Sequence, residues 1–67
     1  MEHKPITSSN IATVGYDAAT RTMEVTFKSG STYAYENVSP EQVTLLKSHG
    51  TKYLISAIIP HHTSTKL

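Results

Sequence analysis

The segment SHGTK, residues 48–52, combines residue types that suit a phosphate group. If a helix begins at Thr51, its first backbone N–H groups and the positive end of its dipole are available to an anion, Lys52 adds a charge and Ser48 adds a hydroxyl. Gly50 suits the left-handed residue that ends a preceding helix, and His49 stands beside it. A purely structural interpretation stays open, in which Ser48 and Thr51 cap and Gly50 turns.

Two tyrosines, Tyr33 and Tyr35, are spaced by two within STYAYENV, residues 31–38. On an accessible strand their rings could stack with nucleobases, a contact worth roughly 1 to 3 kcal/mol per base. Aromatic residues at this spacing are more often core residues whose hydroxyl reaches the surface. We expect Tyr33 to pack in the core and Tyr35 to keep its hydroxyl at an edge, where Tyr16 or Tyr53 would line the same groove.

Two basic residues, Arg21 and Lys28, lie at the predicted hairpin turns. Side chains at such positions are usually solvated. If a polyanion binds this protein, these two cations are the exposed basic groups most free to reach it.

The histidines offer little for catalysis or metal binding. A nucleophile needs a base within hydrogen-bond reach and usually a third group that orients the base. His49 has a defined place, but adjacent residues such as Ser48 rarely point at a common centre, and a helix end favours a protonated imidazole without catalysis. His61 and His62 lack further ligands at a useful spacing, and the chain has no cysteine. The sequence predicts no enzymatic activity, no metal and no cofactor.

Length and charge limit the class of protein. A chain of 67 residues without cysteine makes one small domain, which buries only about 60% of its unfolded surface, so a homo-oligomer is the expected source of extra stability. The net charge of +1 is far from the basic surface of proteins that bind nucleic acid through phosphates alone. The chain has neither a membrane-spanning run nor a signal peptide, which predicts a soluble, cytoplasmic protein. The domain is placed at residues 8–60, with flexible polar tails at 1–7 and 61–67.

Alternating residues predict three strands in the first half of the chain, at residues 9–16, at residues 22–28 and around the two central tyrosines. A three-residue loop of Lys28, Ser29 and Gly30 would place both tyrosines opposite the apolar face of the second strand. A two-residue turn would place them on the wetter face, but it would need a positive φ at Ser29. We favour the longer loop. The first strand presents an apolar face that suits an oligomer interface, formed by Ala12, Val14 and Tyr16.

The second half of the chain carries strong helix signals. Ser39 suits the N-cap, Pro40 the first helical position, and Gln42 completes a capping box. A second short helix is expected over residues 51–59, although residues 52–59 are rich enough in β-branched side chains to form a strand instead. The predicted fold class is α+β, a three-stranded antiparallel meander followed by two short helices packed on one face. Its predicted core is made of Met23, Val25, Phe27, Leu46, Ile55 and Ile58.

The segments SSNIATVGYD, MEVTFKSGSTYAY, NVSPEQV and SHGTKY, in this order, resemble the KTSC domain family, which takes its name from the C-terminus of some lysyl-tRNA synthetases. The resemblance covers nearly all of residues 8–59. It implies the α+β fold, and the association with synthetases implies RNA binding. Stand-alone copies occur in bacteria and their viruses. The basic and aromatic ending that is usual in the family is replaced here by Ile59, Pro60, His61 and His62.

These observations lead to one functional expectation and one alternative. The expected function is a non-catalytic binding module for a nucleotide-type anion, either an RNA segment or a small signalling nucleotide, cyclic forms included, which a viral anti-defence sponge would sequester. The near-neutral charge favours a short ligand over a long duplex. The alternative is a protein–protein interaction module that docks the open sheet face on a larger protein partner.

Overall fold

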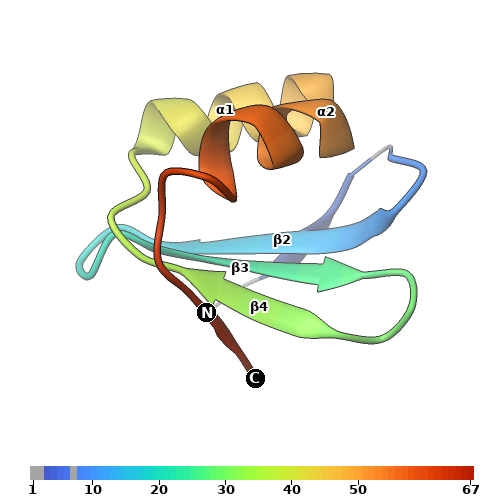
Figure 1. The fold of residues 1–67 in the computed structure, drawn as a ribbon, viewed down its shortest axis with the longest axis horizontal. Coiled ribbons are helices and arrows are strands. Elements are labelled where there is room, and N and C mark those ends of the chain that lie inside the picture. Colours follow the sequence, from blue (N-terminus) through green and yellow to red (C-terminus); the bar gives the residue numbers. More distant parts are fainter. Residues whose placement is uncertain (1–2, 7) are drawn as a thin grey trace.

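Five antiparallel strands form one sheet in which each strand pairs with its neighbours along the chain, in the order β1-β2-β3-β4-β5. The computed structural model describes residues 3–6 and 8–67. The strands are β1 (His3–Pro5), β2 (Ile11–Asp17), β3 (Thr22–Phe27), β4 (Thr32–Tyr35) and β5 (Ser64–Lys66). The helices are α1 (Pro40–His49), α2 (Thr51–Tyr53) and the π-helical turn η1 (Leu54–Ile58), which continues α2. All of the helices cover one face of the sheet, as Figure 1 shows. The α+β class is therefore confirmed, and the expected three-stranded meander is incomplete because the sheet has five strands.

The turn between β3 and β4 fixes which face the tyrosines occupy. Gly30 has a φ of 101°, its N–H donates to the carbonyl of Phe27 (2.9 Å), and the N–H of Phe27 donates to the carbonyl of Ser31 (2.8 Å). Three residues therefore form the loop, and Tyr33 pairs with Val25. The expected register is confirmed, because Val25 pairs with Tyr33 and Met23 with Tyr35, and both residues of β3 are buried beneath the helices.

A bulge changes which side chains of β2 face the core. Ile11 pairs with Phe27 and Thr13 with Thr26, so Ala12 is the extra residue. An extra residue shifts the alternation by one, and Ile11 and Val14, both buried, therefore point to the same face. The expectation that Ala12, Val14 and Tyr16 share an open face is wrong. Val14 belongs to the core, and Tyr16 packs against the core and donates its hydroxyl to the carbonyl of Val38.

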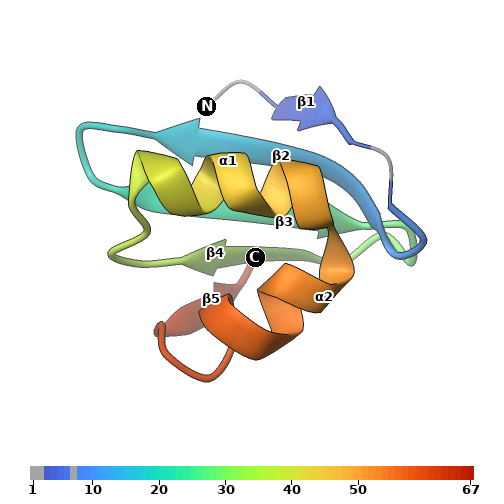
Figure 2. The same cartoon turned by 90° about the horizontal axis from the view of Figure 1, so that it is seen from above.

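Helix α1 begins and ends as its sequence predicts. The Ser39 hydroxyl accepts from the N–H of Gln42 (3.2 Å), and the Gln42 side chain accepts from the N–H of Ser39 (3.0 Å). Gly50, with a φ of 69°, ends the helix and donates to the carbonyl of Leu46 (2.7 Å). Figure 2 shows α1 lying over the centre of the sheet, with α2 displaced towards β4 and β5.

The second helical segment resolves the helix-or-strand alternative in favour of a helix. Its last turn is π-helical, and the N–H of Ile59 donates to the carbonyl of Leu54 (2.9 Å). Leu54 and Ile58 are fully buried, whereas Ile55 is 59% exposed. The assignment of Ile55 to the core is therefore wrong, and Leu54 takes its place there.

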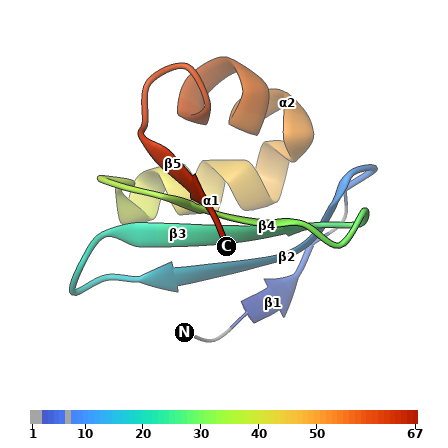
Figure 3. The same cartoon turned by 60° about the horizontal axis from the view of Figure 1, so that its bottom comes forward.

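Strands β1 and β5 come from the segments expected to be flexible polar tails, and that expectation is wrong for both strands (Figure 3). β1 lies along β2, where the ring nitrogens of His3 lie 3.0 Å from Thr13 Oγ1 and 2.9 Å from Glu24 Oε1. β5 lies along β4, and the ring of His62, just before β5, donates from Nδ1 to the carbonyl of Glu36 (2.8 Å). These polar contacts join segments that are far apart in sequence, so a local sequence pattern cannot predict them.

Candidate functional site

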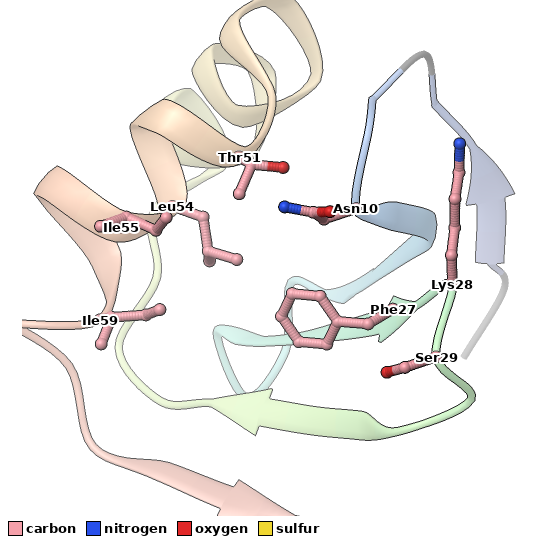
Figure 4. A pocket seen from close by; sticks show the side chains of 8 residues that line it. All are labelled: Asn10, Phe27, Lys28, Ser29, Thr51, Leu54, Ile55 and Ile59. Atoms are coloured by element: carbon pink, nitrogen blue, oxygen red, sulfur yellow. The ribbon is translucent and has the colours of Figure 1, made fainter.

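A pocket of about 370 Å³ opens between the start of α2, the turn that joins β3 to β4, and the loop that precedes β2. Figure 4 shows side chains from all three segments around it. The pocket is lined by Asn10, Phe27, Lys28, Ser29, Thr51, Leu54, Ile55 and Ile59.

One side of the pocket is apolar. The ring of Phe27 forms its base, held by an edge-on contact with Tyr33 at a centroid distance of 5.8 Å and an interplanar angle of 78°. Leu54 reaches it from the core side of the helix, while Ile55 and Ile59 are 59% and 48% exposed and stand along its rim. An aromatic ring with aliphatic neighbours offers a flat apolar group a place to stack.

The opposite side of the pocket is polar. Thr51 Oγ1 lies 2.8 Å from Ser8 Oγ, a hydrogen bond that ties the loop before β2 to the second helix. The carbonyl of Asn10 accepts from the N–H of Lys28 (2.8 Å), so this loop is also tied to the β3–β4 turn. In Figure 4 the side chain of Asn10 points between Thr51 and Phe27. Lys28 also lines the pocket, but in Figure 4 its side chain extends away from the Phe27 ring, and its ammonium lies on the far side of Asn10 from the helix side chains.

Of the junction segment proposed as an anion site, only Thr51 lines the pocket. Gly50 is buried where the two helices meet, and Ser48, His49 and Lys52 are exposed outside the pocket. The ring of His49 lies 6.4 Å from that of Tyr53, centroid to centroid. Of the residues named from the sequence, Thr51 and Lys28 therefore line one pocket, whereas Ser48, His49 and Lys52 lie outside it.

The tyrosines face the helices, and their expected order of burial is wrong. Tyr35 is 3% exposed and belongs to the core, whereas Tyr33 is half-buried behind Phe27. Tyr16 and Tyr53 pack against the same core, and none of the four tyrosines lines the pocket. Burial chiefly, and the neighbouring Tyr33 phenol in addition, raise the pKa of Tyr35 above its ordinary value.

Arg21 and Lys28 lie at opposite ends of β3 and cannot meet at one small ligand. Arg21 has a φ of 56°, and its carbonyl accepts from the N–H of Val38 (2.9 Å). Lys28 is therefore the cation of the pair that lies at the pocket.

Sequence reasoning missed six lining residues: Asn10, Phe27, Ser29, Leu54, Ile55 and Ile59. The sequence did carry one signal of an exposed apolar surface here. Residues 54–59 contain four large aliphatic side chains, and a short helix that packs on one neighbour cannot bury all four. Asn10 and Ser29 carry no such signal, since polar residues beside strands are ordinary turn residues.

Neither a metal cluster nor a membrane span is found in the described part of the chain. Within residues 3–6 and 8–67, no three histidine, cysteine, aspartate or glutamate side chains are grouped so that they could hold a metal ion. No helix in these ranges is long and apolar enough to cross a membrane.

Comparison with known proteins gives a consistent family assignment. An uncharacterized protein of Stutzerimonas stutzeri strain A1501 is 41% identical over 46 residues, which cover 69% of this chain and 65% of that protein, so the match leaves about a third of the relative's length outside. The crystal structure of a KTSC domain protein from Yersinia pestis matches with a TM-score of 0.85 and 28% identity over 98% of this chain and 96% of that one. The family model of the KTSC domain matches residues 7–53, and the chain therefore belongs to the KTSC domain family.

Proposed function

We propose that this chain is a non-catalytic binding module that holds a nucleotide-type anion in the pocket between α2 and the β3–β4 turn. The observation that carries the proposal is the pairing of an aromatic and aliphatic wall with a polar edge in one small cavity. A base can stack on Phe27 and the aliphatic side chains, which contact one of its faces. The hydroxyls of Ser29 and Thr51 suit the sugar, and Lys28, whose flexible side chain can rotate towards the pocket, suits the phosphate.

The size of the pocket favours a small nucleotide over RNA. Ligand pockets range from roughly 300 to 1,000 Å³, and about 370 Å³ is near the lower end, which suits one nucleoside phosphate unit of a free or cyclic nucleotide. On the uncovered sheet face, the outward positions of β2 to β4 hold no aromatic residue, and the His3 ring of β1 already contacts Thr13 and Glu24, so in the described strands this face has no row of rings on which RNA bases would stack. Those outward positions include Thr13, Gly15, Glu24, Thr26, Thr32 and Ala34.

The composition of the pocket favours retention of the ligand over its conversion. None of the eight lining residues is a histidine, aspartate or glutamate, and general acid–base catalysis most often uses these side chains. A protein that holds a signalling nucleotide without altering it acts as a sponge, and the same chemistry would serve a viral anti-defence protein.

The proposal is tested by calorimetric titration of the full chain with nucleoside monophosphates, cyclic di- and trinucleotides and single-stranded RNA at two salt concentrations. We expect stoichiometric, salt-tolerant binding of a small nucleotide, since many phosphate contacts would give RNA a steep salt dependence. Native mass spectrometry of the same samples reports the number of subunits and any nucleotide that remains bound. Failure of every nucleotide to bind would overturn the proposal.

Two matched substitutions locate the binding site. Ile55 and Leu45 are both exposed helix residues, at 59% and 42%, but only Ile55 lines the pocket. Ile55→Asp places a carboxylate beside the ligand and should weaken binding at least about tenfold, whereas Leu45→Asp should leave the affinity unchanged. An equal effect of the two variants would show that the nucleotide binds elsewhere.

Protein–protein interaction is the second candidate function, now at a different surface from the one first expected. The exposure of Ile55 and Ile59 favours it, because exposed aliphatic groups beside a concave site are typical of protein contacts. This candidate predicts a chain that binds no nucleotide but retains a larger protein, and that loses this protein on Ile55→Asp and keeps it on Leu45→Asp.

A further inference from the structure

We propose that the preferred base is adenine and that Asn10 recognises it, an inference that rests on the proposed nucleotide site. The backbone of Asn10 is held on both sides, because its N–H donates to Ser8 Oγ (3.4 Å) and its carbonyl accepts from the N–H of Lys28 (2.8 Å). Its exposed side chain points into the space between Thr51 and Phe27 (Figure 4). The carboxamide makes no hydrogen bond to any residue of the described chain, so it is available to a ligand.

A carboxamide recognises a donor and an acceptor placed side by side. It offers an N–H₂ donor and a carbonyl acceptor in one plane. The exocyclic amine of adenine is flanked by a ring-nitrogen acceptor on each side, so either edge of the base can pair with Asn10. Guanine presents two acceptors, N7 and O6, on its imidazole side, and it can pair with a carboxamide only through its opposite edge.

The apolar wall favours purine bases, which have two fused rings, over pyrimidine bases, which have one. Cytosine and uracil also place a donor beside an acceptor, so Asn10 alone does not reject them. A purine covers more of the apolar surface formed by Phe27, Leu54 and Ile55, and the free energy of this contact grows with the apolar area removed from water. Adenine is therefore favoured on two grounds: two of its edges fit the carboxamide against one edge of guanine, and its two rings cover more of the wall than a pyrimidine does.

The inference is tested with the 5′-monophosphates of adenosine, guanosine, cytidine and uridine, titrated into the native chain, Asn10→Ala and Asn10→Asp. We expect the native chain to bind the adenosine nucleotide more tightly than the guanosine nucleotide, because two edges of adenine and only one edge of guanine pair with a carboxamide. Asn10→Ala should remove most of this preference and keep weaker binding of both purines. Asn10→Asp can accept two hydrogen bonds but donate none, so it should shift the preference towards guanine, whose N1–H and N2–H₂ both donate.

Ser29→Asp is the control for the added charge, because Ser29 lines the same pocket from the β3–β4 turn. It should weaken all four nucleotides by the same factor and leave their ratios unchanged. Equal affinity of the native chain for adenosine and guanosine nucleotides, or an unchanged ratio in Asn10→Ala, would overturn the role of Asn10 while the pocket remains a nucleotide site. Absence of binding by all four nucleotides and the cyclic ligands would instead overturn the proposed function itself.

Discussion

Each end of β3 carries a turn with one basic residue, Arg21 or Lys28, and yet the two turns have different surroundings. At the Arg21 end the next loop closes over the turn: Val38 is fully buried, its N–H donates to the Arg21 carbonyl, and its own carbonyl accepts from Tyr16. At the Lys28 end no loop of the described chain closes over the turn in this way, and the pocket lies between this turn, the start of α2 and the loop before β2. The difference teaches that the elements packed above a charged turn determine whether a pocket forms beside it, and that the sequence of the turn does not encode this.

The largest expected effect is a loss of stability on truncating Leu54 in the wall of the pocket, compared with truncating Ile55 at its rim. Leu54 is fully buried and Ile55 is 59% exposed, although both line the pocket. Leu54→Ala should lower the free energy of unfolding by about 2 to 5 kcal/mol, the cost of deleting buried methyl groups and leaving a cavity. Ile55→Ala should change it by less than about 0.5 kcal/mol, as is usual for exposed positions. Urea unfolding followed by circular dichroism measures both, and equal losses would contradict this division.

A smaller effect is expected at the closed end of the sheet. Tyr16→Phe removes the hydroxyl that donates to Val38 and leaves the ring in place. The free energy of unfolding should fall by about 1 kcal/mol, the net worth of one such hydrogen bond, or somewhat more because a buried carbonyl loses its partner. Tyr53→Phe is the matched control, since the Tyr53 hydroxyl has no hydrogen bond within the described chain. A Tyr16 variant as stable as the control would show that the closed end does not depend on this contact.

Substitutions of the two basic turn residues, Lys28 and Arg21, should differ in their effect on nucleotide affinity and not in their effect on stability. Lys28→Asn removes the charge beside the pocket and should weaken nucleotide binding several-fold, the effect of an exposed charge contact worth up to about 1 kcal/mol. Arg21→Asn removes a charge at the other end of β3 and should leave the affinity unchanged; asparagine tolerates the positive φ of 56° at this position. Titration of both variants with the nucleotide at two salt concentrations measures these affinities. Equal weakening would mean that net charge, and not position, governs binding.

Much of the fold was predictable because its signals are local. The glycine at position 30 favoured the three-residue loop, and the loop set the register of Tyr33. Ser39 and Gln42 specified the start of α1 through contacts within one helical turn. The bulge at Ala12 was not predictable, because nothing in a run of small and β-branched residues marks the one that leaves the ladder.

The candidate site was predictable only in part, and the reason is physical. Lys28 and Thr51 were named from the sequence, and both line the pocket. Asn10 and Ile55 meet them through tertiary packing, in which the Ser8–Thr51 hydrogen bond joins residues 43 positions apart. Spacing along the chain reports neighbours within an element, and it carries no information on which elements meet.

The smallest effect should appear only in alkaline solution and concerns Tyr35, which lies beneath the helices near the closed end. Burial chiefly, and Tyr33 in addition, raise the pKa of the Tyr35 phenol above 10.0. The unfolded chain ionises this phenol near its ordinary pKa while the folded chain keeps the proton, so the unfolded state binds fewer protons in this range. Stability is therefore complete below about pH 10 and falls as the pH rises through the raised pKa. Between about pH 9 and pH 11, the urea midpoint of the native chain should fall more steeply than that of Tyr35→Phe, which keeps the ring but cannot ionise. Tyr53→Phe should follow the native curve, and if Tyr35→Phe followed it as well, the buried phenol would contribute nothing to the alkaline loss of stability.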